Sequence, residues 1–124
     1  MLGRLAKDAS HLYISCGPTD FRKQIDGLVA MINLQFKLDP FTDRCVFIFC
    51  NKRKNSIKVL RYDNNGFILA SKKLLDGMKF QWPKNAAEVK EITPQQLDWL
   101  LQGLSIEQKK ALHPVKMSVE KACF

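Results

Sequence analysis

The stretch that decides the fold spans residues 45–83 and reads CVFIFC-NKRKN-SIKVLRY-DNNG-FILASKKLL-DGMKFQWP. Its segments are rich in β-branched, aromatic and aliphatic residues, and short polar turns separate them, which is the pattern of consecutive β-hairpins. The pattern predicts an antiparallel meander of about four strands, the last of them around Phe80 and Trp82. The later turns carry residues that tolerate a positive φ angle: Asn64, Asn65 and Gly66 in one, Asp76 and Gly77 in the other.

The first strand of this meander, residues 45–50, is apolar at every position, so we expect it at the centre of the sheet with both faces covered. Cys45 and Cys50 are separated by an odd number of positions, which directs their side chains to opposite faces. They cannot then bind one metal ion, and neither His11 nor His113 has metal-ligand spacing. We therefore expect buried thiols, no metal and no cofactor.

The residues before this stretch predict a strand followed by a helix. Residues 11–16 alternate apolar and polar side chains, and Gly17 with Pro18 ends that strand. Thr19 or Asp20 is then placed to cap a helix over residues 20–36. Its apolar side chains recur at steps of three and four and so form one face that can cover the sheet: Phe21, Ile25, Leu28, Val29, Ile32 and Phe36.

The residues after it predict a polar connector and short helices. Residues 84–91 form the connector, and Thr93, Pro94 and Gln96 carry the signature of a helix start with a capping box. Gly103 ends that helix, and a shorter helix is expected over residues 105–112.

The chain of 124 residues is the size of one ordinary domain. We therefore expect a single α+β domain over residues 11–112, an antiparallel meander sheet covered by one amphipathic helix, with short C-terminal helices. Residues 1–10 are expected to be a flexible arm and residues 113–124 a mobile tail.

Charge limits the classes of partner. Lys and Arg total 20 against 12 Asp and Glu, a net charge of +8, which favours an anionic partner and nucleic acid first. A basic protein without a polyanionic partner is the alternative. No apolar run approaches the ~20 residues of a membrane helix, and the first residues do not form a secretory signal. We expect a cytoplasmic protein that does not contact membranes.

The turn after the first meander strand is the strongest functional feature. It is basic and has no acid nearby, and further cations follow on the next strands. The candidate DNA-binding residues here are Asn51, Lys52, Arg53, Lys54, Asn55, Lys58 and Arg61, with Lys72, Lys73 and Lys79 beyond them. The cations would contact phosphates, and Asn51 or Asn55 would meet a base edge if the ribbon entered the major groove. The alternative is a solvated turn whose lysines keep the sheet edge from aggregating.

A second candidate anion site lies at residues 17–23. The free N–H groups of a helix start attract phosphate, and Arg22 and Lys23 would reinforce that attraction. Both cations would otherwise oppose the helix dipole. The alternative is a self-sufficient cap in which Asp20 supplies the negative charge. A thiol in this environment, Cys16, would have a lowered pKa.

Several segments together resemble one protein family. Residues 13–28, YISCGPTDFRKQIDGL, resemble the opening signature of the TnpB accessory proteins of IS66-type bacterial insertion sequences. The family's second block is similar to residues 47–54 (FIFCNKRK), 63–67 (DNNGF) and 80–83 (FQWP), and LDWLLQGL at residues 97–104 also fits. The resemblance covers residues 12–104, and the order and spacing of the segments make it specific.

The resemblance implies an accessory factor in DNA transposition that works beside a separate transposase, which performs the strand chemistry. Its partners would be DNA, at the ends of the element, and the cognate transposase. The resemblance names a process and leaves the molecular role and the oligomeric state open.

Two other classes of function compete with DNA binding. A metal-dependent nuclease needs clustered carboxylates, and the acids here show no ligand spacing: Asp20, Asp26, Asp39, Asp43 and Asp63. A module that docks on the transposase could use Trp82, Trp99 and the helix at residues 97–104, although each of these also suits the core of a small domain. The sequence favours a non-catalytic protein that binds DNA through the basic hairpin.

Overall fold

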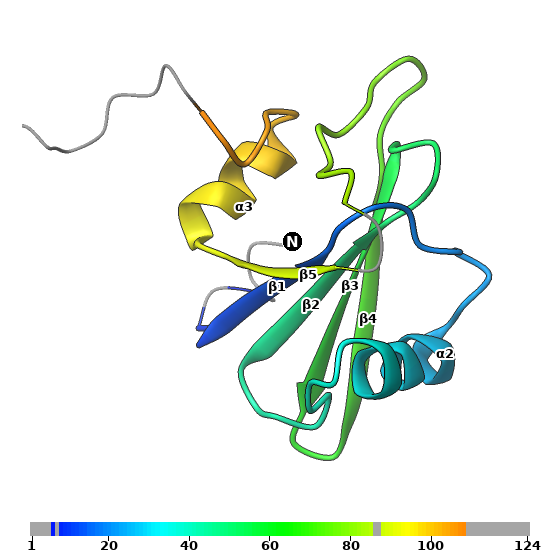
Figure 1. The fold of residues 1–124 in the computed structure, drawn as a ribbon, viewed down its shortest axis with the longest axis vertical. Helices are drawn as coiled ribbons and strands as arrows, with labels where there is room; N and C mark the ends of the chain where they lie inside the picture. Colours follow the sequence, from blue (N-terminus) through cyan, green and yellow to red (C-terminus); the bar gives the residue numbers. More distant parts are fainter. Residues whose placement is uncertain (1–5, 7, 86–87, 109–124) are drawn as a thin grey trace, which may run out of the picture.

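The computed structural model describes residues 6, 8–85 and 88–108, which form a five-stranded sheet with helices on both faces (Figure 1). The strands are β1 (His11–Ser15), β2 (Cys45–Cys50), β3 (Ser56–Asp63), β4 (Gly66–Lys73) and β5 (Val89–Ile92). The helical segments are α2 (Ile25–Ala30), a π-helical continuation η1 (Met31–Gln35), and α3 (Pro94–Leu101). The strand order is β4-β3-β2-β1-β5. The α+β class is confirmed.

The meander is confirmed for three strands and is wrong for the fourth. Strands β2, β3 and β4 are antiparallel neighbours, and Asp63 pairs with Gly66 across a tight turn in which Asn64 has a φ of 59°. The sheet as a whole is mixed, because β1 runs parallel to β2 while β5 runs antiparallel to β1. A parallel partner needs a crossover connection, and the segment containing α2 and η1 provides it. Part of the predicted polar connector is therefore the edge strand β5.

Residues 80–83 cover the sheet instead of extending it. The Phe80 and Trp82 side chains are 2% and 5% exposed and belong to the core cluster on the α3 side. The Trp82 indole Nε1 donates a hydrogen bond of 2.8 Å to the Ser15 carbonyl oxygen at the end of β1. A buried indole N–H requires an acceptor, and this contact explains why the segment lies across the sheet.

Strand β2 is central and fully buried, as predicted. Cys45 packs with Phe47 and Phe49 under α2 and η1, whereas Cys50 packs on the opposite face, the face covered by α3. The prediction that the two cysteines face opposite sides is confirmed. Both faces of β2 are therefore covered by other elements.

The first helix starts later than predicted. Helix α2 begins at Ile25 after the N-cap Gln24, so the prediction of a cap at Thr19 or Asp20 is wrong. The Thr19 N–H donates to the Cys50 carbonyl (2.8 Å), and the Lys58 ammonium donates to the carbonyls of Phe21 and Lys23 (3.0 Å each). These contacts hold residues 19–23 against the end of the sheet. The α-helix continues for six residues before the π-helical turn, which ends at Gln35 rather than Phe36.

The start of α3 is confirmed. The Gln96 N–H donates to Thr93 Oγ1 (3.1 Å), and the Thr93 N–H donates to Gln96 Oε1 (2.9 Å), which together make the capping box. Gly103 follows with a φ of 86°. Residues 105–108 are not helical, and the rest of the predicted second helix, residues 109–112, lies outside the described residues, as does the tail. The domain boundaries stay a prediction.

The capping box gives a first stability prediction. We expect Thr93→Ala to lower the free energy of unfolding by about 1 kcal/mol, because α3 loses its side-chain cap. Urea denaturation measures this change. Thr42→Ala, at an exposed threonine outside the helices, is the matched control and should stay within about 0.5 kcal/mol of wild type. Equal effects of the two substitutions would show that the cap contributes nothing.

The buried thiols give a second prediction. Burial raises the pKa of the Cys16, Cys45 and Cys50 thiols, that of Cys50 to about 12, so the expectation of a lowered pKa at Cys16 is wrong. Replacing the fourth cysteine, Cys123, by serine leaves only these three thiols in the chain. Since the thiolate is the reactive form, we expect this Cys123→Ser variant to react with a thiol reagent at pH 8 at least about 100-fold more slowly when folded than in denaturant. Comparable rates in the two conditions would contradict this burial.

The same shift sets a direction for stability against pH. The folded protein keeps the Cys50 proton to a higher pH than the unfolded chain does. The raised pKa therefore contributes to the free energy of unfolding, and this contribution is fully present below the ordinary thiol pKa of 9.0. It is lost as the pH rises from there towards 12.

Candidate nucleic-acid interface

Three segments that are distant in the sequence meet at one end of the sheet. They are residues 17–23 after β1, the turn of residues 51–55 between β2 and β3, and the loop of residues 74–79 after β4. The Leu74 N–H donates to the Asn55 carbonyl and the Phe80 N–H to the Lys54 carbonyl, both at 2.7 Å. Figure 1 shows the β2–β3 turn and the loop after β4 together at the upper right. We call the surface formed by residues 17–23, 51–55, 72–79 and 84 the basic end.

The β2–β3 turn is held by its two asparagines. Asn51 Oδ1 accepts hydrogen bonds from the N–H groups of Asn55 and Ser56 (3.1 Å each), and Asn51 Nδ2 donates to Asn55 Oδ1 (2.6 Å). Both polar atoms of the Asn51 amide and the Oδ1 atom of Asn55 thus make hydrogen bonds inside the protein. Their geometry leaves Lys52 and Arg53 exposed at the tip of the turn.

Two of the predicted DNA-binding cations contact the protein itself. The Lys58 ammonium, besides its two carbonyl acceptors, lies 4.9 Å from the centroid of the Phe21 ring. Arg61 Nη1 donates to Asp8 Oδ1 (2.8 Å), and the Arg61 side chain is only 14% exposed. Lys58 ties β3 to the segment before α2, and Arg61 ties β3 to the residues before β1. The structure therefore does not bring their charged groups to the tip of the turn.

The segment of residues 17–23 is not the first turn of a helix, because α2 starts at Ile25. Arg22 donates to the Asp20 carboxylate through Nε (3.1 Å) and Nη2 (2.8 Å), and the Arg22 N–H also donates to Asp20 Oδ1 (3.0 Å). The guanidinium lowers the pKa of the Asp20 carboxyl to about 2. Asp20 thus offsets part of the Arg22 charge, while Lys23 is exposed beside it.

A shallow cleft of about 460 Å³ joins the two segments predicted separately as anion sites. The turn before α2 forms one wall with Pro18, Thr19, Asp20, Phe21 and Arg22, and the β2–β3 turn forms the other with Asn51, Lys52 and Arg53. Arg22 and Arg53 therefore line one surface although thirty positions of chain separate them.

More cations reach this end of the sheet through strand pairing and packing. Lys72 and Lys73 are opposite Ile57 and Ser56 at the start of β3, directly beside the turn. Lys84 lines a hollow of about 200 Å³ together with Lys52 and Lys54. Lys84 was missed by the sequence reasoning, since no local pattern connects it to a turn thirty residues earlier.

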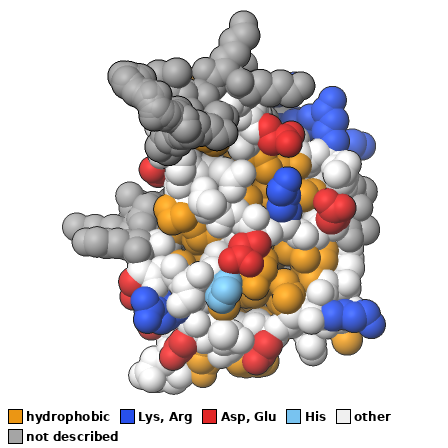
Figure 2. Space-filling model, turned by 60° about the vertical axis from the view of Figure 1, so that its left-hand side comes forward, with side chains coloured by type: hydrophobic (Ala, Val, Ile, Leu, Met, Phe, Trp, Pro, Cys, Tyr) orange, Lys and Arg blue, Asp and Glu red, His pale blue; other side chains and the backbone are white. Residues whose placement is uncertain are grey.

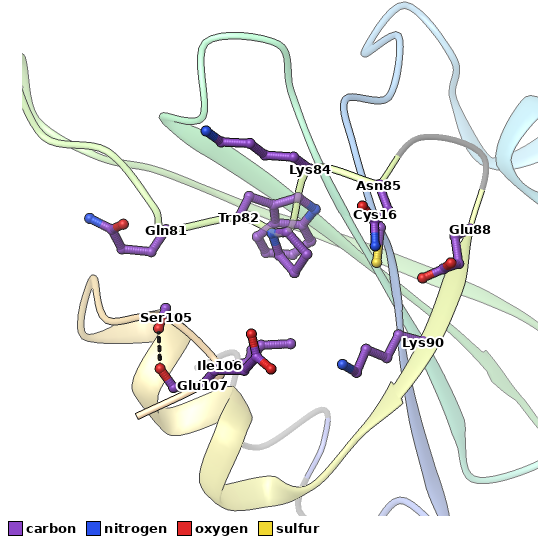
Figure 3. Close-up of a pocket in the computed structure, with 11 residues that line it drawn as sticks. Cys16, Gln81, Trp82, Lys84, Asn85, Glu88, Lys90, Ser105, Ile106 and Glu107 are labelled. Carbon is purple, nitrogen blue, oxygen red and sulfur yellow. Dashed lines mark hydrogen bonds between the residues drawn. The ribbon is translucent and has the colours of Figure 1, made fainter. Parts of the chain in front are cut away.

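A hollow on the α3 side has a different character. It measures about 310 Å³, and Figure 3 shows side chains of both signs around it, Lys84 and Lys90 with Glu88 and Glu107. Its acids offset its lysines, so this hollow has no strong preference for a polyanion. Figure 2 likewise shows acidic and basic side chains interspersed with apolar ones over one face of the molecule.

The structure also shows the surroundings of the residues that a nuclease or a docking module would use. Among the described residues, no three His, Cys, Asp or Glu side chains are grouped so as to hold a metal ion. Trp82, Leu97 and Leu100 belong to the domain's own core, and Trp99 is half-buried. In the described part of the chain, none of the helices is long and apolar enough to cross a membrane.

Comparison with known proteins identifies the family. The model of a family described as "IS66 Orf2 like protein" matches residues 10–111. The chain belongs to the IS66 Orf2-like family. The resemblance inferred from the sequence is thereby confirmed, and the protein is an IS66 Orf2-like accessory protein of insertion sequences.

Two relatives of this IS66 Orf2-like protein occur in Sinorhizobium fredii (strain NBRC 101917 / NGR234). Uncharacterized protein y4jC is 28% identical over 110 residues, which cover 86% of this chain and 92% of the relative. Uncharacterized protein y4hO is 32% identical over 93 residues, covering 75% of this chain and 79% of the relative. No solved structure matches significantly.

Proposed function

We propose that this IS66 Orf2-like protein is a non-catalytic factor that binds DNA at the ends of its element, within a complex that includes the transposase. The excess of positive charge at the basic end is the observation that supports this proposal. Its acids are Asp20 and Asp76, and they are outnumbered by the cations Arg22, Lys23, Lys52, Arg53, Lys54, Lys72, Lys73, Lys79 and Lys84.

The predicted DNA-binding residues would have different roles, according to their surroundings in the fold. Lys52 and Arg53 are exposed at the tip and would contact phosphates directly, with Arg22 across the cleft and the exposed Lys23 next to Arg22 in the chain. Asn51 and Asn55 hold the tip in place through their mutual hydrogen bond. Lys58 and Arg61 brace β3 against its neighbours and add only to the field around the site.

Contacts of this kind position a protein on DNA and do not read its sequence. Neutralising five phosphates of duplex DNA gives a slope of about −4.5 in a plot of log affinity against log salt concentration. Preference for element ends would then come from the shape of the DNA or from the transposase. Docking on the transposase without DNA contact is the competing function, and the burial of Trp82 removes one of the side chains offered for it.

A binding titration tests the proposal. The purified chain is titrated with a fluorescent duplex from an element end, and with a shuffled duplex of the same composition, at several salt concentrations between 50 and 300 mM. We expect binding to both duplexes at low salt and a slope near −4.5. A chain that binds neither duplex at 50 mM salt, but retains the transposase in a pull-down, would support the docking function instead.

A further inference from the structure

The loop after β4 exposes two apolar side chains at the two ends of one tight turn. Leu75 is 78% and Met78 53% exposed. The Met78 N–H donates to the Leu75 carbonyl (3.1 Å), and Gly77 has a φ of 84°, as a tight turn with glycine in its third position requires. Leu75 and Met78 are the first and last residues of this turn, so it brings their backbones close together at its base.

The loop is anchored at both ends. The hydrogen bonds from Leu74 to Asn55 and from Phe80 to Lys54 attach its two ends to consecutive residues of the β2–β3 turn. Phe80 is in addition buried in the core. The turn bearing Leu75 and Met78 therefore projects from the basic end as a short and firmly based tip, visible at the upper right of Figure 1.

Single exposed apolar residues are ordinary, but this pair belongs to a lysine-rich segment of the basic end. Lys72 and Lys73 precede the loop, Lys79 lies within it, and Lys54 accepts its closing hydrogen bond through the backbone. An apolar protein surface would have to desolvate these ammonium groups. Duplex DNA instead offers phosphates to the lysines and the apolar faces of stacked bases to the side chains between them.

We propose that Leu75 and Met78 form a wedge that enters the minor groove of the bound duplex and partly unstacks one base step. Leu and Met are among the side chains that minor-groove proteins insert in this way, kinking the DNA. The inference rests on the proposed function, since the wedge acts only if the basic end holds DNA. It adds a distortion of the DNA to what would otherwise be a contact with phosphates alone.

The test compares the wild-type chain with Leu75→Ala/Met78→Ala. Leu34→Ala is the matched control, because Leu34 is 74% exposed and lies in η1, away from the basic end. All three proteins are titrated with a duplex carrying donor and acceptor dyes at its ends and 2-aminopurine at its central steps. Energy transfer reports the bend, 2-aminopurine fluorescence reports unstacking, and the salt slope reports phosphate contacts.

We expect wild type and Leu34→Ala to raise both energy transfer and 2-aminopurine fluorescence. The double variant should lose both signals and about tenfold in affinity, while its salt slope stays within about 0.5 of wild type, since no phosphate contact is removed. Wild type should also prefer a duplex with a central mismatch, whose unstacking costs less, and the double variant should lose that preference.

Other outcomes separate the wedge from the proposed function. Wild-type binding without bending or unstacking would overturn the wedge and leave DNA binding intact. Loss of binding to vesicles of phosphatidylserine and phosphatidylcholine in the double variant, with no change in DNA distortion, would overturn it in favour of a lipid surface. No DNA binding by wild type at 50 mM salt would overturn the proposed function itself.

Discussion

Lys52→Gln combined with Arg53→Gln makes the salt dependence of DNA binding less steep by about 1.8, because each phosphate contact contributes about 0.9 to the slope. At 0.1 M salt this corresponds to a loss of affinity of roughly 60-fold. Both side chains are exposed at the tip of the β2–β3 turn, so their replacement should leave the fold unchanged. Fluorescence anisotropy at several salt concentrations measures both quantities.

The control separates local contact from net charge. Lys37→Gln combined with Lys90→Gln removes the same charge from two exposed positions outside the basic end, one after η1 and one on β5. We expect this variant to keep the wild-type slope within about 0.5. Equal changes in the two double variants would mean that net charge alone, and no particular surface, controls the association.

Trp82→Ala is expected to have the largest effect on stability. The side chain is 5% exposed, and its removal leaves a cavity on the α3 side of the sheet, so we expect the free energy of unfolding to fall by about 3–5 kcal/mol. Trp82→Phe keeps most of the apolar contact but leaves the Ser15 carbonyl without the indole donor. It should cost less, about 1–3 kcal/mol. Urea denaturation followed by circular dichroism measures both changes.

Trp82 also supports the basic end, because the next residue, Pro83, accepts a hydrogen bond from the Gly17 N–H (2.7 Å). The matched control is Trp99→Phe, at the half-buried tryptophan of α3, which should cost less than Trp82→Phe. A larger loss at Trp99 than at Trp82 would contradict the placement of residues 80–83 over the sheet.

Features that depend on neighbouring residues were predictable from the sequence. The apolar run of residues 45–50 indicated a central strand, and the alternation of residues 11–16 indicated β1 to within one residue. The capping box at Thr93 needs only residues three apart, and it forms as expected. In each case the physical cause lies within a few positions of the chain.

Features that depend on tertiary contacts were not predictable. The helix was expected from Asp20, but the Lys58 ammonium, far along the chain, binds the carbonyls of residues that would have formed its first turn. Strand β5 has the sequence pattern of a polar connector because it is a short edge strand with exposed Lys90 and Glu91. The parallel pairing of β1 with β2 likewise leaves no mark in the local pattern.

The candidate site shows the same division. The cluster of cations around Lys52 and Arg53 was visible in the sequence, and so were Arg22 and Lys23. That Arg22 shares a cleft with Lys52 and Arg53 follows only from the packing of residues 17–23 against the end of β2. The same packing explains the different environments of Lys58 and Arg61, whose neighbours Phe21 and Asp8 are distant in sequence.

The central claim is that the basic end is the surface that contacts DNA, and amide-resolved NMR tests it most directly. The ¹⁵N-labelled chain is titrated with an element-end duplex at low salt, and shifts of the backbone amide signals are mapped on the fold. We expect the largest shifts at residues 17–23, 51–55 and 72–79 and little change in α3 and β5. Shifts concentrated in α3 and β5, with the β2–β3 turn unchanged, would contradict the account.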